Sequence, residues 1–264
     1  MTSPSTGAQI IYGNNQLALV IGQVRYPELP RFDDDAYVRG FAEALRDQYP
    51  LASSEPALNI VVTEAGDVTR QEAGKIFRFN TIDKAYAVVL SREFVALECR
   101  QYAKFQDFIE RLHPVLTLVR DCFAVKWQLR AGLRYINEMR WDKLRTYEQW
   151  RERLNAEYMG WDPAPVLKGR VLHTLAEFAL QRDDGVYILR RGFLRGSTVA
   201  SDVVPNVPEY YLIDHDYTDS HPREFDVNPI DRFRAYNDYM VNVFTKMTDS
   251  HDLQMFLMEG PSDE

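Results

Sequence analysis

The sequence has little of several features that would mark a particular class of protein. It contains two cysteines, Cys99 and Cys122, in 264 residues. They are too few for a disulfide framework and lack the spacing of a zinc site. Free thiols are typical of a reducing compartment, so we expect a cytoplasmic protein. No apolar run is long enough to cross a membrane. The N-terminus has no basic stretch followed by an apolar one, so we expect no secretory signal.

The motifs that identify many enzymes are missing as well. The sequence contains no Walker-type phosphate loop, no Gly-x-Gly-x-x-Gly, no Gly-x-Ser-x-Gly and no His-Glu-x-x-His. Its net charge of −8 argues against a protein that coats nucleic acid through a general positive field, although a local basic patch would still fit. These absences leave no catalytic motif from which an activity could be assigned.

What is present is the composition of an ordinary globular protein, with 45% hydrophobic and 27% charged residues. Alternating and helical apolar patterns follow one another along the chain. The predicted strands are residues 16–25, 59–63, 75–81, 85–90, 93–100, 127–137, 170–181, 186–194 and a strand within 210–221. The predicted helices are residues 38–49, 104–123, 147–158, 233–247 and a short one at 253–257.

This order of elements predicts the α+β class. Hairpins outnumber strand–helix–strand units, so we expect a largely antiparallel sheet with the long helices packed on one face. Residues 13–145 and 146–264 each contain a meander followed by a long helix, which predicts two loosely similar halves. The segment between them lacks the composition of a flexible linker, so we expect residues 1–264 to form a single compact unit.

Several short motifs together resemble a known group of proteins. They are residues 24–27 (Val-Arg-Tyr-Pro), the strand–turn–strand region 77–94, the aromatic helix at 102–108, residues 132–137 (Gly-Leu-Arg-Tyr-Ile-Asn), and a late Asp-x-Asp strand with Asp214 and Asp216. The chain resembles, over most of its length, a sporadically distributed, uncharacterised bacterial and archaeal family. That family has no agreed activity, so the resemblance implies no catalytic residue. Its patchy distribution implies an accessory role in bacteria, linked to antiviral defence.

The late strand holds the candidates for a metal site: Asp214, Asp216, Asp219 and His221. On a strand, Asp214 and Asp216 point to one side, and the last two could fold back from the following turn. Carboxylates with one histidine suit Mg²⁺ or Mn²⁺ and phosphoryl chemistry. The competing interpretation is a solvated strand face that needs no metal or other cofactor. We favour it, because no further ligands stand at fixed spacing.

A second group of candidates lies on the strand at 127–137. Arg130 and Arg134 flank Gly132, which leaves a gap that a ligand or another backbone could enter. Two arginines beside such a gap could clamp a phosphate or carboxylate. Alternatively they pair with Asp214 and Asp216 on a neighbouring strand, which is the interpretation we favour. Asn137, at the end of the strand, is included as a ligand or interface candidate.

The most basic segment contains Arg190, Arg191 and Arg195, with aromatic residues nearby. Aromatic side chains among arginines can stack on bases and hold phosphates, which would suit a nucleic-acid-binding module. In an acidic protein, a solvated hairpin is the better explanation of the same residues.

These observations favour a non-enzymatic module that binds another protein, or a second copy of itself, in a bacterial, defence-linked system. The reasons are the aromatic content of 12% and the lack of a catalytic motif, since aromatic and arginine side chains are common interface anchors. One alternative is a metal-dependent phosphoesterase or nuclease that uses the Asp-rich strand. The other is a nucleic-acid-binding module.

Overall fold

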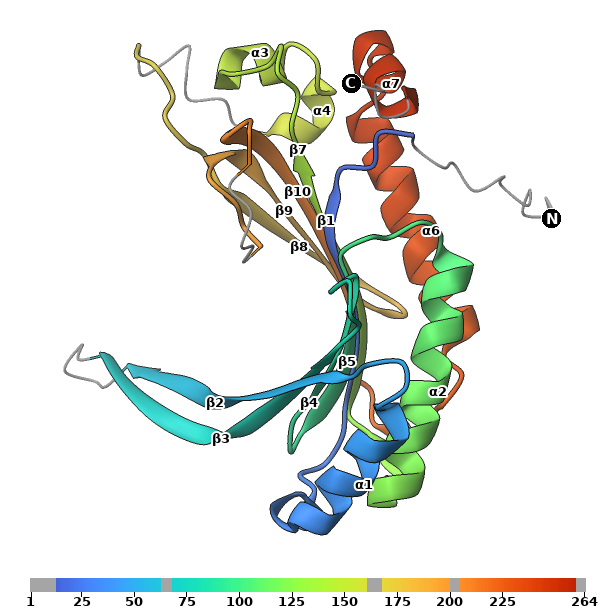
Figure 1. Cartoon of the computed structure of the whole chain (residues 1–264). Helices are drawn as coiled ribbons and strands as arrows, with labels where there is room; N and C mark the ends of the chain where they lie inside the picture. The colour runs from blue at the N-terminus through green and yellow to red at the C-terminus, as the bar shows by residue number, and fades with distance from the viewer. Residues whose placement is uncertain (1–12, 63–67, 161–167, 200–204, 260–264) are drawn as a thin grey trace, which may run out of the picture.

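The computed structural model describes residues 13–62, 68–160, 168–199 and 205–259 (Figure 1). Its central element is a nine-stranded antiparallel sheet in the order β2-β3-β4-β5-β1-β7-β10-β9-β8. The strands are β1 (Leu17–Arg25), β2 (Leu51–Val62), β3 (Val68–Asn80), β4 (Tyr86–Leu90), β5 (Phe94–Cys99), β7 (Arg130–Met139), β8 (Ala176–Arg182), β9 (Gly185–Arg195) and β10 (Glu209–Asp219). A separate two-stranded sheet pairs β6 (Trp127–Gln128) with β11 (Arg223–Glu224).

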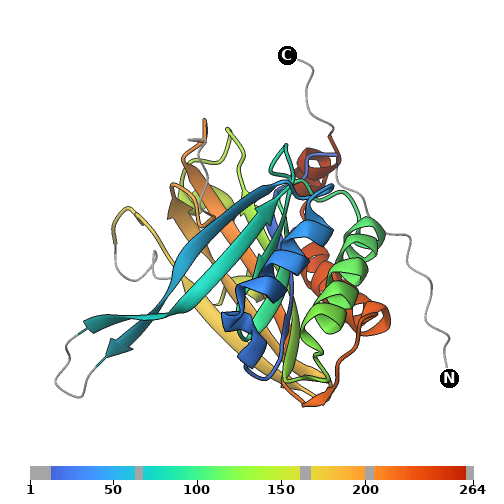
Figure 2. The same cartoon turned by 60° about the horizontal axis from the view of Figure 1, so that its bottom comes forward.

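The longer helices lie on one face of the large sheet, and the sheet curves away from them so that its other face is concave (Figures 1 and 2). The helices are a 3-10 turn η1 (Pro30–Asp33), α1 (Asp35–Leu45), α2 (Phe105–Phe123), α3 (Tyr147–Arg151), α4 (Ala156–Met159), α6 (Ile230–Met247) and α7 (His251–Met258). The predicted α+β class and antiparallel sheet are therefore confirmed. None of the helices in the described ranges is both long and apolar enough to cross a membrane.

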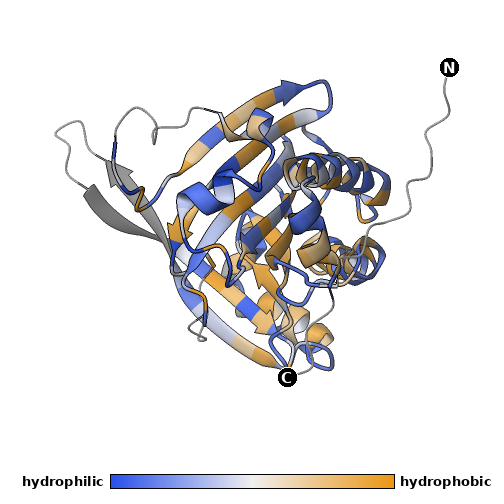
Figure 3. Cartoon of the chain, turned by 90° about the horizontal axis from the view of Figure 1, so that it is seen from above, coloured by the Kyte–Doolittle hydropathy of each residue, from blue (hydrophilic) through white to orange (hydrophobic). Residues whose placement is uncertain are grey.

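The main core fills the space between the sheet and these helices. Hydrophobic and hydrophilic residues alternate along several strands (Figure 3), so one face of those strands is available to the core. The apolar stripe of α2, from Phe105 to Phe123, is buried against it, as its helical spacing predicts. The helix continues through Pro114 without ending. On the concave face a smaller cluster of Leu19, Ile136, Val199, Tyr210 and Leu212 is buried as well.

The β2–β3 hairpin is much longer than the sequence indicates. The two strands pair from Leu51–Asn80 to Val62–Val68, whereas only residues 59–63 and 75–81 have a strand pattern. Residues 51–56 at the start of β2 are all exposed, so neither face carries an apolar residue into the core. Without a buried face there is no alternation for the sequence to display. The helix before it, α1, ends at Leu45 rather than at residue 49.

The sheet has two halves, β1–β5 and β7–β10, which meet where β1 pairs with β7. The second half therefore begins with β7, which lies before residue 146. In each half the first strand pairs with the last, β1 with β5 and β7 with β10, and the remaining strands extend outward. Ile21 lies opposite Arg134, and Arg25 lies opposite Arg130. An Arg-Tyr pair occurs at residues 25–26, at the end of β1, and again at residues 134–135, within β7.

Gly192 of β9 gives a test of the packing at the outer part of the sheet. A Cβ at this position would collide with the carbonyl oxygen of Thr174, in the segment that precedes β8. We predict that Gly192→Ala lowers the free energy of unfolding by about 2 kcal/mol, because backbone atoms must move. Gly40 of α1 has open space around it, so Gly40→Ala should raise the same quantity by roughly 1 kcal/mol. Urea unfolding of both variants tests this packing, and effects of the same sign would contradict it.

Candidate functional site

The concave face carries a cluster of three arginines and two aspartates, here called the concave-face cluster: Arg130, Arg134, Arg190, Asp214 and Asp216. They come from the neighbouring strands β7, β9 and β10. Arg134 holds Asp214 with two hydrogen bonds, from Nε to Oδ1 at 2.8 Å and from Nη2 to Oδ2 at 2.7 Å. The Asp214 side chain is only 1% exposed. The predicted pairing of arginines on β7 with this strand is therefore confirmed for Arg134 and Asp214.

The other members of the concave-face cluster are also engaged. The Nε of Arg190 donates to Glu177 of β8 at 2.7 Å, and its Nη1 lies 3.6 Å from the Oδ2 of Asp214. Arg130 donates to the side chain of Gln23 at 3.2 Å and lies 4.0 Å from Asp216. Burial raises the pKa of the Asp216 carboxyl, and the nearby guanidinium groups oppose that rise. Three arginines thus face three carboxylates, and their charges balance without a ligand.

The gap that Gly132 was expected to leave is filled by the protein itself. A Cβ at Gly132 would lie 2.7 Å from the Cγ2 of Thr218 on β10. The glycine therefore allows close packing of two adjacent strands rather than the approach of a ligand. Asn137 is also used internally, since its Nδ2 donates to the backbone oxygen of Ile213 at 2.9 Å.

The four candidates for a metal site, the interpretation that the sequence did not favour, do not converge. Asp214 and Asp216 lie on the concave face, whereas Asp219, at an odd spacing along β10, lies on the opposite face. No group of three or more candidate ligand residues able to hold a metal ion occurs within the described ranges. Asp219 instead accepts hydrogen bonds from Arg223 and from the backbone of His221, and it lies 3.8 Å from Arg232.

The local surroundings of Asp219 support an ion-pair role. Burial acts to raise the pKa of its carboxyl, but the hydrogen bonds from His221 and the charge of Arg223 outweigh it and leave the pKa below its usual value. The Nδ1 of His221 lies 2.6 Å from Oδ1 of Asp219. The carboxylate oxygens that a metal would need are therefore already engaged, Oδ1 by His221 and Oδ2 by Arg223.

The basic segment of β9 does not form a single patch. Arg190 belongs to the concave-face cluster, while Arg191, the next residue, points to the opposite face toward Gly160. Arg195 is at the end of the strand, 3.8 Å from Glu209, with 74% of its side chain exposed. Strand alternation separates the arginines that stand close together in the sequence. They do not build the continuous basic surface that a nucleic acid requires.

A pocket near His215 is a feature that the sequence did not predict. His215 lies on the helix-facing side of β10, between the buried residues Ile213 and Tyr217. Its Nδ1 lies 2.7 Å from the hydroxyl of Tyr187, while its Nε2 has no hydrogen-bond partner among the described residues. Burial lowers the pKa of His215 to about 4, with a smaller opposing effect from Asp214. The only hint in the sequence was a histidine at a position where the alternation demands an apolar residue.

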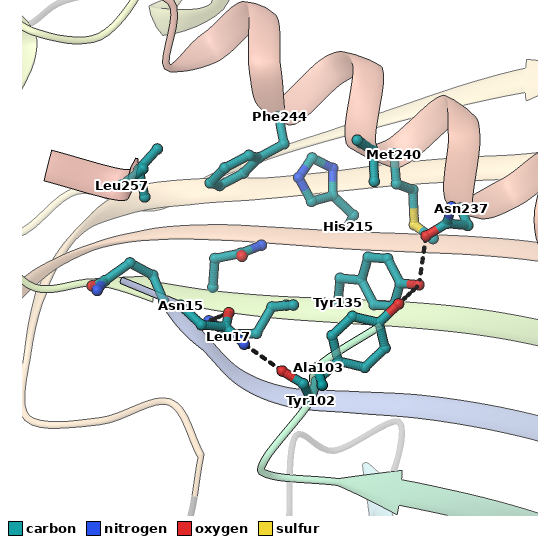
Figure 4. A pocket seen from close by; sticks show the side chains of 13 residues that line it. Asn15, Leu17, Tyr102, Ala103, Tyr135, His215, Asn237, Met240, Phe244 and Leu257 are labelled. Carbon is teal, nitrogen blue, oxygen red and sulfur yellow. Dashed lines mark hydrogen bonds between the residues drawn. The ribbon is translucent and has the colours of Figure 1, made fainter. Parts of the chain in front are cut away.

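Three further polar residues of this pocket satisfy one another. The hydroxyl of Tyr135 donates to Oδ1 of Asn237 at 2.8 Å and lies 3.1 Å from the hydroxyl of Tyr102. Because the Tyr135 proton is used, Tyr102 must be the donor in the second bond. The chain joins β7 to α6 and to the segment before α2, and Figure 4 shows it at one end of the pocket.

The last unusual surface is the outer edge of the sheet at β8. This strand pairs with β9 on one side, and no other described strand pairs with it. Three large apolar side chains lie on or just before it and are mostly exposed: Leu172 by 71%, Leu175 by 62% and Phe178 by 56%. An exposed strand edge lined with apolar residues is a feature that soluble proteins usually avoid.

Comparison with known proteins does not assign this chain to a family. No family model matches the chain. No curated protein matches it either. The resemblance of residues 24–27 and 132–137 to an uncharacterised family therefore stays a prediction, and the function must be argued from the surfaces described above.

The Arg134–Asp214 pair gives a prediction about stability. We expect Asp214→Asn to lower the free energy of unfolding by about 3 kcal/mol, because it leaves partly buried guanidinium groups without their counter-charge. Arg25 of β1 also pairs with a carboxylate, that of Glu93, but at the surface, with 44% and 53% of the two side chains exposed. Glu93→Gln should therefore lower the free energy of unfolding by less than about 1 kcal/mol. Chemical denaturation would refute the argument if both variants lost the same amount.

His215 predicts a specific pH dependence. Its pKa is about 4 in the folded protein and roughly 6.5 in an unfolded chain. Between these values the unfolded chain binds a proton that the folded protein does not, so stability falls as the pH drops from 6.5 toward 4. We expect His215→Gln to flatten this dependence between pH 7 and 5 in denaturation curves. His251→Gln, which removes an exposed histidine, is the control, and an unchanged slope in His215→Gln would contradict the assignment.

Proposed function

We propose that the protein is a protein-interaction module without a catalytic role of its own, and that it works by joining the edge of β8 to the same strand of a second copy. The observation that carries the proposal is the exposed apolar edge at β8. A strand edge presents a row of backbone donors and acceptors that another strand can pair with. The bacterial, defence-linked setting implied by the family resemblance is part of the proposal.

The two edges of the sheet differ in how they are protected. The opposite edge, β2, carries Pro56 and an irregular register next to it. Proline and bulges are devices by which proteins prevent unwanted pairing at an edge. In contrast, β8 has no proline and no lysine, and it pairs with β9 in a continuous register from Ala176 to Arg182. One edge is therefore blocked and the other is left available, which supports β8 as the interface.

The sequence of β8 is compatible with itself in an antiparallel pair. If a two-fold axis passes through Ala179, Phe178 lies opposite Leu180 of the second copy. On the concave side Glu177 lies opposite Gln181. On the face of Phe178 and Leu180, Ala176 lies opposite Arg182. Apolar side chains then meet on one face, and no two like charges lie directly opposite each other, as a stable cross-strand pair requires. This complementarity favours a second copy as the occupant of the edge.

Neither alternative function has comparable support. A metal-dependent phosphoesterase or nuclease would need Asp214, Asp216 and Asp219 to converge, but they lie on opposite faces of β10. A nucleic-acid-binding module would need a continuous basic surface, whereas Arg190 and Arg191 point to opposite faces of β9. Charges on the concave face are balanced by neighbouring side chains.

The proposal predicts a dimer that one charge can break. Ala179→Lys would place two lysines directly opposite each other at the two-fold axis, so we expect a monomer where the wild type is a dimer. The measurement is sedimentation equilibrium up to about 100 μM, at which a dimer of micromolar affinity is largely formed. Ile82→Lys is the matched control, because Ile82 is a 73% exposed apolar residue in the β3–β4 turn, away from the edge.

Two results would overturn the proposal. A wild-type protein that stays monomeric over the whole concentration range would exclude self-pairing. A dimer that persists unchanged in Ala179→Lys would place the interface elsewhere on the molecule. In the expected case, raising the salt concentration should partly restore the dimer of Ala179→Lys, because ions screen the repulsion between exposed charges.

A further inference from the structure

The pocket beside His215, here called the His215 pocket, lies between the sheet and the C-terminal helices (Figure 4). Its lining comes from the start of β1, the segment before α2, β7, β10, α6 and α7. The pocket opens to solvent on one side, and its empty volume of about 690 Å³ includes part of that solvent.

The lining of the His215 pocket is polar on one side and apolar on the other. The apolar wall is made by Leu17, Met240, Val241, Phe244 and Leu257. The polar wall contains three asparagines, Gln16, two tyrosines and His215, and no lysine, arginine, aspartate or glutamate is among the described residues that line the pocket. A charged molecule would lose its hydration here without finding a counter-charge, so the pocket favours an uncharged one.

Two polar groups of the pocket remain available to a ligand. The first is Nε2 of His215, which is buried and has no hydrogen-bond partner in the described part of the chain. The second is the carboxamide oxygen of Asn137, because the nitrogen of that group is held by Ile213. An unpaired buried polar group is unfavourable, so a ligand that pairs with it is stabilised by the hydrogen bond it restores.

Aromatic rings frame the space around these groups. Phe244 contacts the ring of His215 edge to face, with 6.3 Å between the ring centres. Figure 4 shows Phe244, His215 and Tyr135 surrounding the same space. The Phe244 and His215 rings are in contact, so a flat guest would pack against their exposed faces and edges rather than between them. Asparagine and histidine add the donor and acceptor groups that can read the polar edge of such a ring.

We propose that the His215 pocket binds a nucleobase, either free or as an uncharged nucleoside. The guest places its flat ring against Phe244 and Met240, and its polar edge pairs with Nε2 of His215 and the carboxamide oxygen of Asn137. A phosphate on the guest weakens binding, because no cationic side chain lines the pocket.

The test is a ligand-observed NMR titration of the wild-type protein with adenine, cytosine, guanine and uracil, with their nucleosides, with adenosine 5′-monophosphate, and with toluene. We expect at least one base or nucleoside to bind with a Kd below about 1 mM. Adenosine 5′-monophosphate should bind about ten-fold more weakly than adenosine. If free bases have a lower Kd than nucleosides, or the reverse, the difference shows which of the two forms the pocket accepts.

Two variants connect binding to the pocket. Val241→Trp fills it from α6 and Leu17→Trp fills it from β1, and each should weaken binding by about ten-fold or more, since bulk replaces the guest. Asn242→Trp adds the same bulk at the neighbouring exposed position and should leave the Kd within about two-fold. If one filling variant fails to fold by circular dichroism, the other decides.

Three outcomes would overturn the proposal. The first is no binding of any base or nucleoside at about 5 mM, a ligand concentration well above the expected Kd of about 1 mM or less. The second is binding that a folded filling variant leaves unchanged. The third is toluene binding as tightly as the best base, since that would show a pocket that selects only for apolar surface.

Discussion

The central pairing of β1 with β7 determines where every other feature of the sheet lies. These strands join the two halves, and the neighbours of each belong to its own half. A slip of one residue in a β-ladder moves all side chains of a strand to the opposite face. Such a slip would bury Arg134 under the helices and expose Tyr135. The core side chains Ala131, Leu133 and Tyr135 therefore fix the register, and the concave face follows from it.

The concave face can carry charges because this register brings opposite charges together. Arg134 is forced outward by the burial of its neighbours Leu133 and Tyr135, and Asp214 by the burial of Ile213 and His215. Each charge would be unfavourable alone, since Asp214 is buried and Arg134 is half-buried, and an uncompensated charge loses hydration there. Their bidentate pairing removes this penalty and requires no external ligand. The positions of Arg134 and Asp214 on the same face of neighbouring strands are sufficient to explain why the two residues carry opposite charges.

Strand alternation allowed much of this to be predicted from the sequence. The helix stripe from Phe105 to Phe123 and the outward direction of Arg134 and Asp214 depend on local periodicity, which a single sequence displays. The long β2–β3 hairpin could not be predicted, because residues 51–56 are exposed and bury no apolar face. The separation of Asp219 from Asp214 depends on how far β10 extends, and the expected fold-back at a turn was wrong because the strand reaches Asp219 itself.

Two features of the structure were not predicted, because each departs from a local rule: that core positions are apolar, or that an exposed edge is polar. His215 is a polar residue in a core position, and Phe178 is an apolar residue on an open edge. Each departure is unfavourable in the isolated chain, because a buried donor or acceptor is unpaired in one case and apolar surface meets water in the other. Proteins commonly break local consistency at sites of function. The opposite edge, where Pro56 lies beside an irregular register, shows that this fold can protect an edge strand. The exposed Phe178 at β8 is therefore a property of the sequence rather than of the architecture.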